Sequence, residues 1–128
     1  MTVERITLGA FQQILRGKVK DPTPCVIKIY SNGCHFCQGL REHYEEMADL
    51  FDDYYFFAFN VEDHPAIEQD ITITGVPTIA FVQTSNRGTG VTVLEDPPFP
   101  HHMSYYTLEQ LKNFLDSLSP EEIKEDEY

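Results

Sequence analysis

The 128-residue chain contains no tryptophan, few basic residues and no long apolar run. Nine lysines and arginines stand against 21 aspartates and glutamates, which gives a formal net charge of −12. This charge repels the phosphates of nucleic acids and anionic lipid surfaces, so we expect neither as a partner. No apolar stretch approaches the ~20 residues that a membrane-spanning helix needs, so we expect no membrane span. The first residues include an early acid and no apolar core, so we expect no export signal.

Length and composition favour one folded domain. Hydrophobic residues make up 41% of the chain, close to the share in globular proteins. We predict a domain over residues 1–118. Residues 119–128 carry five acids and one base, and we predict a solvated, mobile acidic tail there.

Cysteine is scarce as well, and its spacing is informative. Of three cysteines, Cys34 and Cys37 form a C-x-x-C pair, whereas Cys25 stands alone in an apolar run. An odd number without an export signal does not indicate a disulfide scaffold. The pattern indicates a reducing compartment, and we expect Cys25 to act as a small buried hydrophobic residue.

Hydrophobic periodicity predicts alternating strands and helices, and hence a mainly parallel sheet with helices on both faces, closed by an antiparallel hairpin. Predicted strands cover residues 2–6, 25–30, 54–61, 78–82 and 90–94. Predicted helices start after Thr7, span 35–51, run from Pro65 to about Asp70, and follow a capping box at Thr107 and Gln110.

Cys34 falls where a loop ends and the long helix begins. Unpaired backbone N–H groups and the positive helix end favour a thiolate there. Cys37 follows one turn later on the same face, so Cys34 can attack a target disulfide and Cys37 can resolve the mixed disulfide. The alternatives are half of a zinc site or two inert thiols. A structural zinc site needs four ligands, and no second C-x-x-C is present.

The chain resembles the thioredoxin family in two motifs. Cys34-His-Phe-Cys37 stands between a buried strand and a long helix, where that family keeps its active-site pair, and Ile71-Thr-Ile-Thr-Gly-Val-Pro-Thr78 is similar to the segment with its cis-proline. The resemblance covers residues 2–118 in element order. It implies a thioredoxin-like α/β fold with a central mixed sheet.

The resemblance also implies roles for individual residues. Pro77 would be cis and would face the sulfur pair, and the backbone of Val76 would pair with an extended substrate strand. The substrate-contacting residues expected are Phe36, Gly75, Val76 and Thr78, together with Phe99 in the long connection over residues 95–106. The reacting and tuning residues expected are Cys34, Cys37, Pro77, Lys28 and His35.

Several positions depart from the family pattern. Gly33 replaces a tryptophan, and His35-Phe36 replaces Gly-Pro. An imidazolium at His35 would stabilise the thiolate and make the pair more oxidising; the alternative is an exposed residue at the helix start. Lys28 stands where the family has a buried acid, and Ala58 replaces the lysine that pairs with it. Lys28 would accept a proton from Cys37 if neutral and lower both thiol pKa values if charged, or it would simply extend to the surface.

The connection over residues 95–106 is longer than the family needs. Its prolines stiffen it, and its aromatic side chains, Phe99 among them, suit a recognition surface; the alternative is a local cover over the core. The run His101-His102-Met103, with the two motif cysteines, also allows a copper(I) chaperone, although the implied proline beside the pair opposes metal binding.

These observations predict a monomeric enzyme that exchanges protein dithiols and disulfides in the cytoplasm. We expect no bound cofactor beyond the Cys34–Cys37 disulfide, because the chain has no glycine-rich dinucleotide motif. Electrons would come from a separate thioredoxin-type reductase. The alternative is a thioredoxin-like binding or chaperone module whose redox chemistry is incidental.

Overall fold

The computed structural model describes residues 3–16, 23–64, 67, 71, 75–85 and 88–118. The elements are the strands β1 (Glu4–Arg5), β2 (Thr23–Tyr30), β3 (Tyr55–Asn60), β4 (Thr78–Ser85) and β5 (Gly88–Val93), the helices α1 (Leu8–Leu15), α2 (His35–Leu50) and α4 (Leu108–Leu118), and the 3-10 helix η1 (Val61–Asp63). The predicted helix from Pro65 to Asp70 and the acidic tail lie largely or wholly outside the described residues. No described helix is both long and apolar enough to span a membrane.

The five strands form one mixed sheet in the order β1-β3-β2-β4-β5. β2 lies parallel to β3 and antiparallel to β4, and β5 completes the predicted hairpin with β4. The structure therefore confirms the predicted α/β fold. Strands end within a few residues of their predicted bounds, except that β4 and the start of β5 extend further into the hairpin.

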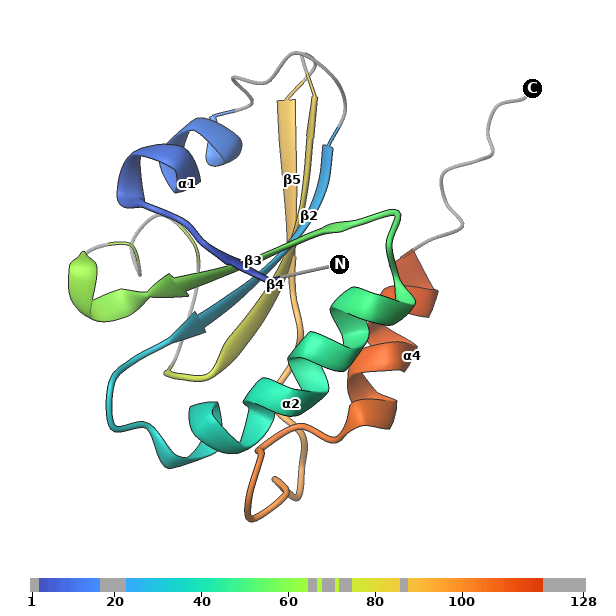
Figure 1. Cartoon of the computed structure of the whole chain (residues 1–128). Helices are drawn as coiled ribbons and strands as arrows, with labels where there is room; N and C mark the ends of the chain where they lie inside the picture. The colour runs from blue at the N-terminus through green and yellow to red at the C-terminus, as the bar shows by residue number, and fades with distance from the viewer. Residues whose placement is uncertain are drawn as a thin grey trace.

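Helices cover both faces of the sheet (Figure 1), with α1 on one side and α2 and α4 on the other. Alternate residues of β2 divide between two cores, since successive side chains of a strand point to opposite faces. Val26 packs in the core under α2 and α4, whereas Ile27 and Ile29 pack in the core beside α1. Lys28 has the parity of Val26 and therefore faces α2.

Helix capping follows the sequence signals. Thr107 and Gln110 cap α4 reciprocally, with the Thr107 N–H 2.9 Å from Gln110 Oε1 and the Gln110 N–H 3.1 Å from Thr107 Oγ1. The Thr7 side chain accepts from the Ala10 N–H at the start of α1. These caps satisfy N–H groups that have no partner within the helix and fix where each helix begins.

Candidate active site

The cysteine pair occupies the first turn of α2. Cys34 is the N-cap residue, and Cys37 Sγ and Cys34 Sγ form a disulfide with the two Cα atoms 5.2 Å apart. Cys34 Sγ accepts a hydrogen bond from the Cys37 N–H at 3.1 Å. Cys34 is half-buried, while Cys37 is only 5% exposed. A partner can therefore reach Cys34, and the helix start offers a hydrogen bond to a thiolate there.

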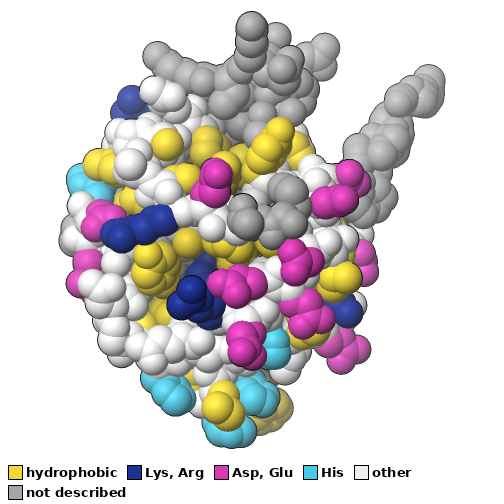
Figure 2. Space-filling view, viewed as in Figure 1, with side chains coloured by type: hydrophobic (Ala, Val, Ile, Leu, Met, Phe, Trp, Pro, Cys, Tyr) yellow, Lys and Arg dark blue, Asp and Glu magenta, His cyan; other side chains and the backbone are white. Residues whose placement is uncertain are grey.

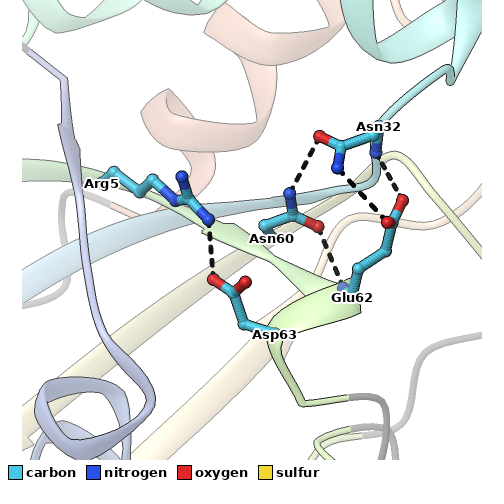
Figure 3. A network of polar contacts seen from close by, with 5 residues as sticks. All are labelled: Arg5, Asn32, Asn60, Glu62 and Asp63. Atoms are coloured by element: carbon cyan, nitrogen blue, oxygen red, sulfur yellow. Dashed lines mark hydrogen bonds and ion pairs between the residues drawn. The ribbon is translucent and has the colours of Figure 1, made fainter.

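The loop before Cys34 is fixed by a polar network (Figure 3). The Glu62 carboxylate of η1 accepts from the Asn32 backbone N–H at 2.7 Å and from Asn32 Nδ2 at 3.3 Å. Asn60, at the end of β3, is buried; its Nδ2 donates to Asn32 Oδ1 at 3.1 Å and its Oδ1 accepts from the Glu62 N–H. Gly33 follows with a φ of +74°, a conformation that glycine adopts without steric cost. The network thus positions the chain just before the nucleophile.

Sequence reasoning missed this network. The local signal was an asparagine at the predicted end of a strand, followed by two acids, because short polar side chains satisfy free backbone groups at such ends. The pairing of Asn60 with Asn32 depends on residues 28 positions apart, which periodicity does not reveal.

The two residues between the cysteines turn toward the long connection that precedes α4. His35 is exposed, and its Nε2 lies 3.2 Å from the carbonyl oxygen of His102, which accepts the hydrogen bond. The Phe36 ring meets the Tyr105 ring edge to face, with centroids 5.4 Å apart. The space-filling view shows histidines gathered with hydrophobic side chains at this end of the molecule (Figure 2).

The backbone of the connection also lies close to α2. A Cβ atom added at Gly39, one turn after Phe36, would overlap the Met103 carbonyl. Tyr105 adopts a positive φ of 66°, and Ser104 and Tyr106 are buried at 2% and 1% exposure. The 95–106 connection is thus anchored in the core at its C-terminal end.

Its tip has the opposite character. Phe99 is 90% exposed and Met103 is 53% exposed. No ring contact joins Phe99 to the cysteine motif in the part of the chain that the structure describes. The interpretation as a local cover therefore describes the connection at Ser104 and Tyr106, whereas Phe99 is accessible at the tip.

The segment with the second motif stands at the start of β4. The Val76–Pro77 peptide bond is cis. Thr78 Oγ1 donates to the Gly75 carbonyl at 2.5 Å, and Thr78 pairs with Ile29 near the end of β2. This register places Pro77 at the end of the sheet from which the loop to Cys34 begins. Gly75 is exposed, Val76 is half-buried, and Pro77 and Thr78 are buried.

Lys28 lies buried under α2 with Ala58 directly opposite it on β3. Its side chain does not extend to the surface, because the residue is 7% exposed. The ammonium lies 5.1 Å from the Tyr44 ring centroid and 5.7 Å from that of Tyr30, so two aromatic faces contact the cation. Burial, with a smaller contribution from Arg41, lowers the pKa of Lys28 to about 8.

The third cysteine, Cys25, lies in a different environment from the motif pair. Cys25 is fully buried in the core beside α1, and burial raises the pKa of its thiol to about 12. Across the described ranges, no group of three or more His, Cys, Asp or Glu side chains is arranged to hold a metal ion.

Three comparisons place this site among known proteins. The family model described as Thioredoxin matches residues 2–95. Thioredoxin H5 of Arabidopsis thaliana is 27% identical over 78 residues, which cover 58% of this chain and 66% of that protein, just under two thirds of its length.

Solved structures show the same fold. Thioredoxin f from spinach chloroplast superposes with a TM-score of 0.66 at 15% identity, covering 91% of this chain and 92% of that one. A chain of the ferredoxin:thioredoxin reductase and thioredoxin f2 complex gives a TM-score of 0.69 at 15% identity, covering 91% and 94%. The matched family and the closed Cys34–Cys37 pair together support thiol–disulfide oxidoreductase function.

Proposed function

The chain belongs to the thioredoxin family, and on that premise we propose that it reduces or forms disulfides in protein substrates, with Cys34 as nucleophile and Cys37 as resolving thiol. The single observation that carries the proposal is the asymmetry of the pair. Cys34 is half-buried at the N-cap of α2, whereas Cys37 is buried. Of the two sulfurs, that of Cys34 is the more accessible to a partner disulfide.

In the reducing direction, the Cys34 thiolate attacks one sulfur of the substrate disulfide and expels the other as a thiolate. The Cys37 thiolate then attacks Cys34 Sγ, which releases the second substrate thiolate and closes the Cys34–Cys37 disulfide. Two electrons pass from the pair to the substrate, which leaves as a dithiol after taking up two protons. The oxidising direction is the reverse.

We assign Lys28 the role of tuning Cys37, because both residues line the same cavity. With a pKa of about 8, Lys28 is mainly protonated at pH 7 and favours the Cys37 thiolate. Above this pKa it is neutral and becomes a proton acceptor. His35 stands outside this cavity; its hydrogen bond to His102 needs a proton on Nε2, which both the neutral and the charged ring can carry.

Substrate contacts are proposed for Phe36, Gly75, Val76, Thr78 and Phe99. Gly75 and Val76 precede β4 and are accessible in part, which suits pairing with an extended strand. Phe36 and Phe99 would add apolar contacts on the side of the 95–106 connection.

The source of electrons is proposed to be a separate reductase. One structural relative is seen in a complex with ferredoxin:thioredoxin reductase, which is the kind of partner we propose here. We further propose a monomer acting in a reducing compartment, with the cytoplasm as the first expectation. The relative from spinach is a chloroplast protein, so cell fractionation should compare these two compartments.

Trapping of mixed disulfides tests the assignment of the two cysteines. Cys37→Ser should accumulate covalent complexes with an oxidised protein such as insulin, because the second step is blocked, and dithiothreitol should release them. Cys34→Ser should trap none and should lose reductase activity. Cys25→Ala, which removes the third thiol without burying a new polar group, is the control and should give the same trapping and reductase activity as the parent chain. Equal trapping by both motif variants would contradict the assignment, and a Cys34→Ser chain that loses reductase activity but still supports the cell's requirement would favour a binding module.

A further inference from the structure

A cavity of about 440 Å³ lies behind the disulfide, on the side away from the 95–106 connection. β1, β2 and β3 form one wall, and the first turns of α2 form the other. Cys37 lines it, whereas Cys34 is not among the residues that surround it. Its volume falls within the range typical of small-molecule sites.

The charge of this cavity is opposite to that of the chain. Three cations, Arg5, Lys28 and Arg41, line it together with a single acid, Glu45, although the chain has a net charge of −12. In the space-filling view, the basic side chains of this face gather beside hydrophobic ones (Figure 2), while most acidic side chains lie to the right.

The two arginines already have partners. Arg5 pairs with Asp63 at 2.8 Å, and Arg41 Nε pairs with Glu45 Oε2 at 3.1 Å. The side chains of Arg5, Arg41 and Glu45 are half to three-quarters exposed, so they form the rim of the cavity rather than its floor. The negative charge of Glu45, the acid at the rim, is therefore balanced by Arg41.

Lys28 is the exception. It is more than nine-tenths buried and lines the cavity, and no carboxylate among the described residues forms an ion pair with it. The rings of Tyr30 and Tyr44 contact the ammonium. The Glu45 carboxylate acts on it only from the rim and is paired with Arg41, a cation that opposes the charge on Lys28. A buried cation without a counter-ion is costly, so an anion that enters the cavity gains an unusually favourable contact.

The remaining walls are apolar. Val3 and Ala58 line the cavity on the strand side, and the tyrosine rings line it near Lys28. A fully hydrated inorganic ion would leave these surfaces in contact with water. A ligand with one negative group and an apolar body would cover them and also meet Lys28.

We propose that this cavity binds a small organic acid, whose carboxylate meets Lys28 Nζ and whose apolar body lies against Val3, Ala58 and Tyr30. The site is distinct from the proposed substrate surface around Cys34. It goes beyond the proposed oxidoreductase function, and its ligand stays bound without reacting with either sulfur.

Three probes separate the chemical requirements in the oxidised protein, where Cys34 and Cys37 form the disulfide and do not titrate. Benzoate carries a carboxylate on an apolar ring, benzamide is its neutral counterpart, and inorganic phosphate has charge without an apolar body. Benzoate should shift the backbone amide resonances of Asn32 and Ala58 in ¹H–¹⁵N spectra, with a dissociation constant on the order of 1 mM. Benzamide and phosphate should each bind at least about tenfold more weakly.

Variants assign the contact. Lys28→Met should weaken benzoate binding by about tenfold or more, whereas Lys112→Met on α4, outside the cavity, should bind as the parent chain does. Thermal unfolding confirms that both variants fold. The proposal would be overturned if benzamide or phosphate bound as tightly as benzoate. It would also be overturned if Lys28→Met bound benzoate as tightly as the parent chain does. Because the readout is binding, its failure would leave the cysteine trapping result unaffected.

Discussion

The two sides of the Cys34–Cys37 pair differ in almost every physical property. On one side, the 95–106 connection brings aromatic and histidine side chains to the surface, and Phe99 is 90% exposed. On the other side, Cys37 backs onto a cavity in which Lys28 is only 7% exposed. One side offers accessible area to a protein, and the other supplies an electrostatic environment. The comparison shows how one disulfide can present a reactive sulfur outward while its second sulfur is adjusted from within.

If the inner side acts through an uncompensated charge, removing that charge should stabilise the fold. Burial holds the pKa of Lys28 at about 8, below the usual 10.5, so the protonated form is disfavoured in the folded chain. This difference in pKa between the folded and unfolded chain corresponds to about 3 kcal/mol. The substitution also removes the contacts of the ammonium with the Tyr30 and Tyr44 rings, which offsets part of the stabilisation. We expect Lys28→Met to raise the free energy of unfolding at pH 7 by about 1–3 kcal/mol, measured by urea denaturation.

The extra stability of Lys28→Met over the parent chain should decrease as the pH rises. Below pH 8, Lys28 is charged in both folded and unfolded chains, and the full penalty applies. Between pH 8 and 10.5 the unfolded chain binds the extra proton, so the parent becomes more stable as pH rises and the advantage of Lys28→Met shrinks. Cys25 is present in both proteins and cancels in the difference. A constant difference in stability across this range would show that packing, not charge, is responsible.

The same variant tests whether Lys28 tunes the cysteine pair. In the reduced proteins, identical thiolate titrations of Lys28→Met and the parent chain would show that Lys28 does not tune the pair.

The close packing of the 95–106 connection against α2 is tested at Gly39. Alanine is a better helix former than glycine by ~1 kcal/mol, yet a Cβ here would overlap the Met103 carbonyl. We expect Gly39→Ala to lower the free energy of unfolding by about 1–3 kcal/mol through overpacking, measured by thermal or urea denaturation. Gly9→Ala in α1 is the matched control, since its added Cβ would meet only ordinary van der Waals contact. It should leave stability unchanged or slightly higher.

Should Gly39→Ala match Gly9→Ala in stability, the connection must move away from α2 at little cost. The 95–106 segment would then be a loosely attached surface loop, and its anchoring by Ser104 and Tyr106 would have been overestimated.

How far the sequence predicts this molecule depends on the range of the interactions involved. The order of strands and helices, the capping box at Thr107 and the place of Cys34 at a helix start follow from local patterns, and the structure agrees with them. The opposition of Lys28 and Ala58 required the strand register, which the family resemblance supplied and the sheet pairing shows. Local physics alone would not have aligned two strands separated by a long helix.

The cavity behind Cys37 could not be predicted in this way. Arg5, Lys28 and Arg41 come from three different elements, so no local pattern brings them together. Likewise, the close approach of Gly39 to Met103 depends on how a long connection folds back over a helix. Such features arise from packing between distant segments, for which hydrophobic periodicity carries no signal.

The smallest expected effect tests the outer side alone. Replacing the whole 95–106 connection would remove Ser104 and Tyr106 from the core, so a single exposed residue gives a cleaner measurement. Phe99→Ser should slow reduction of a protein disulfide, measured with insulin, by roughly threefold to tenfold, up to about 1.4 kcal/mol, because an exposed aromatic ring supplies contact area to a large partner. Reduction of the small disulfide DTNB should be unchanged.

The matched control is Leu50→Ser, because Leu50 is an exposed apolar residue at the other end of α2. This substitution should alter neither rate. Equal slowing with both substrates would mean that Phe99 supports the site itself, and no slowing with insulin would limit recognition to the α2 start and the segment before β4.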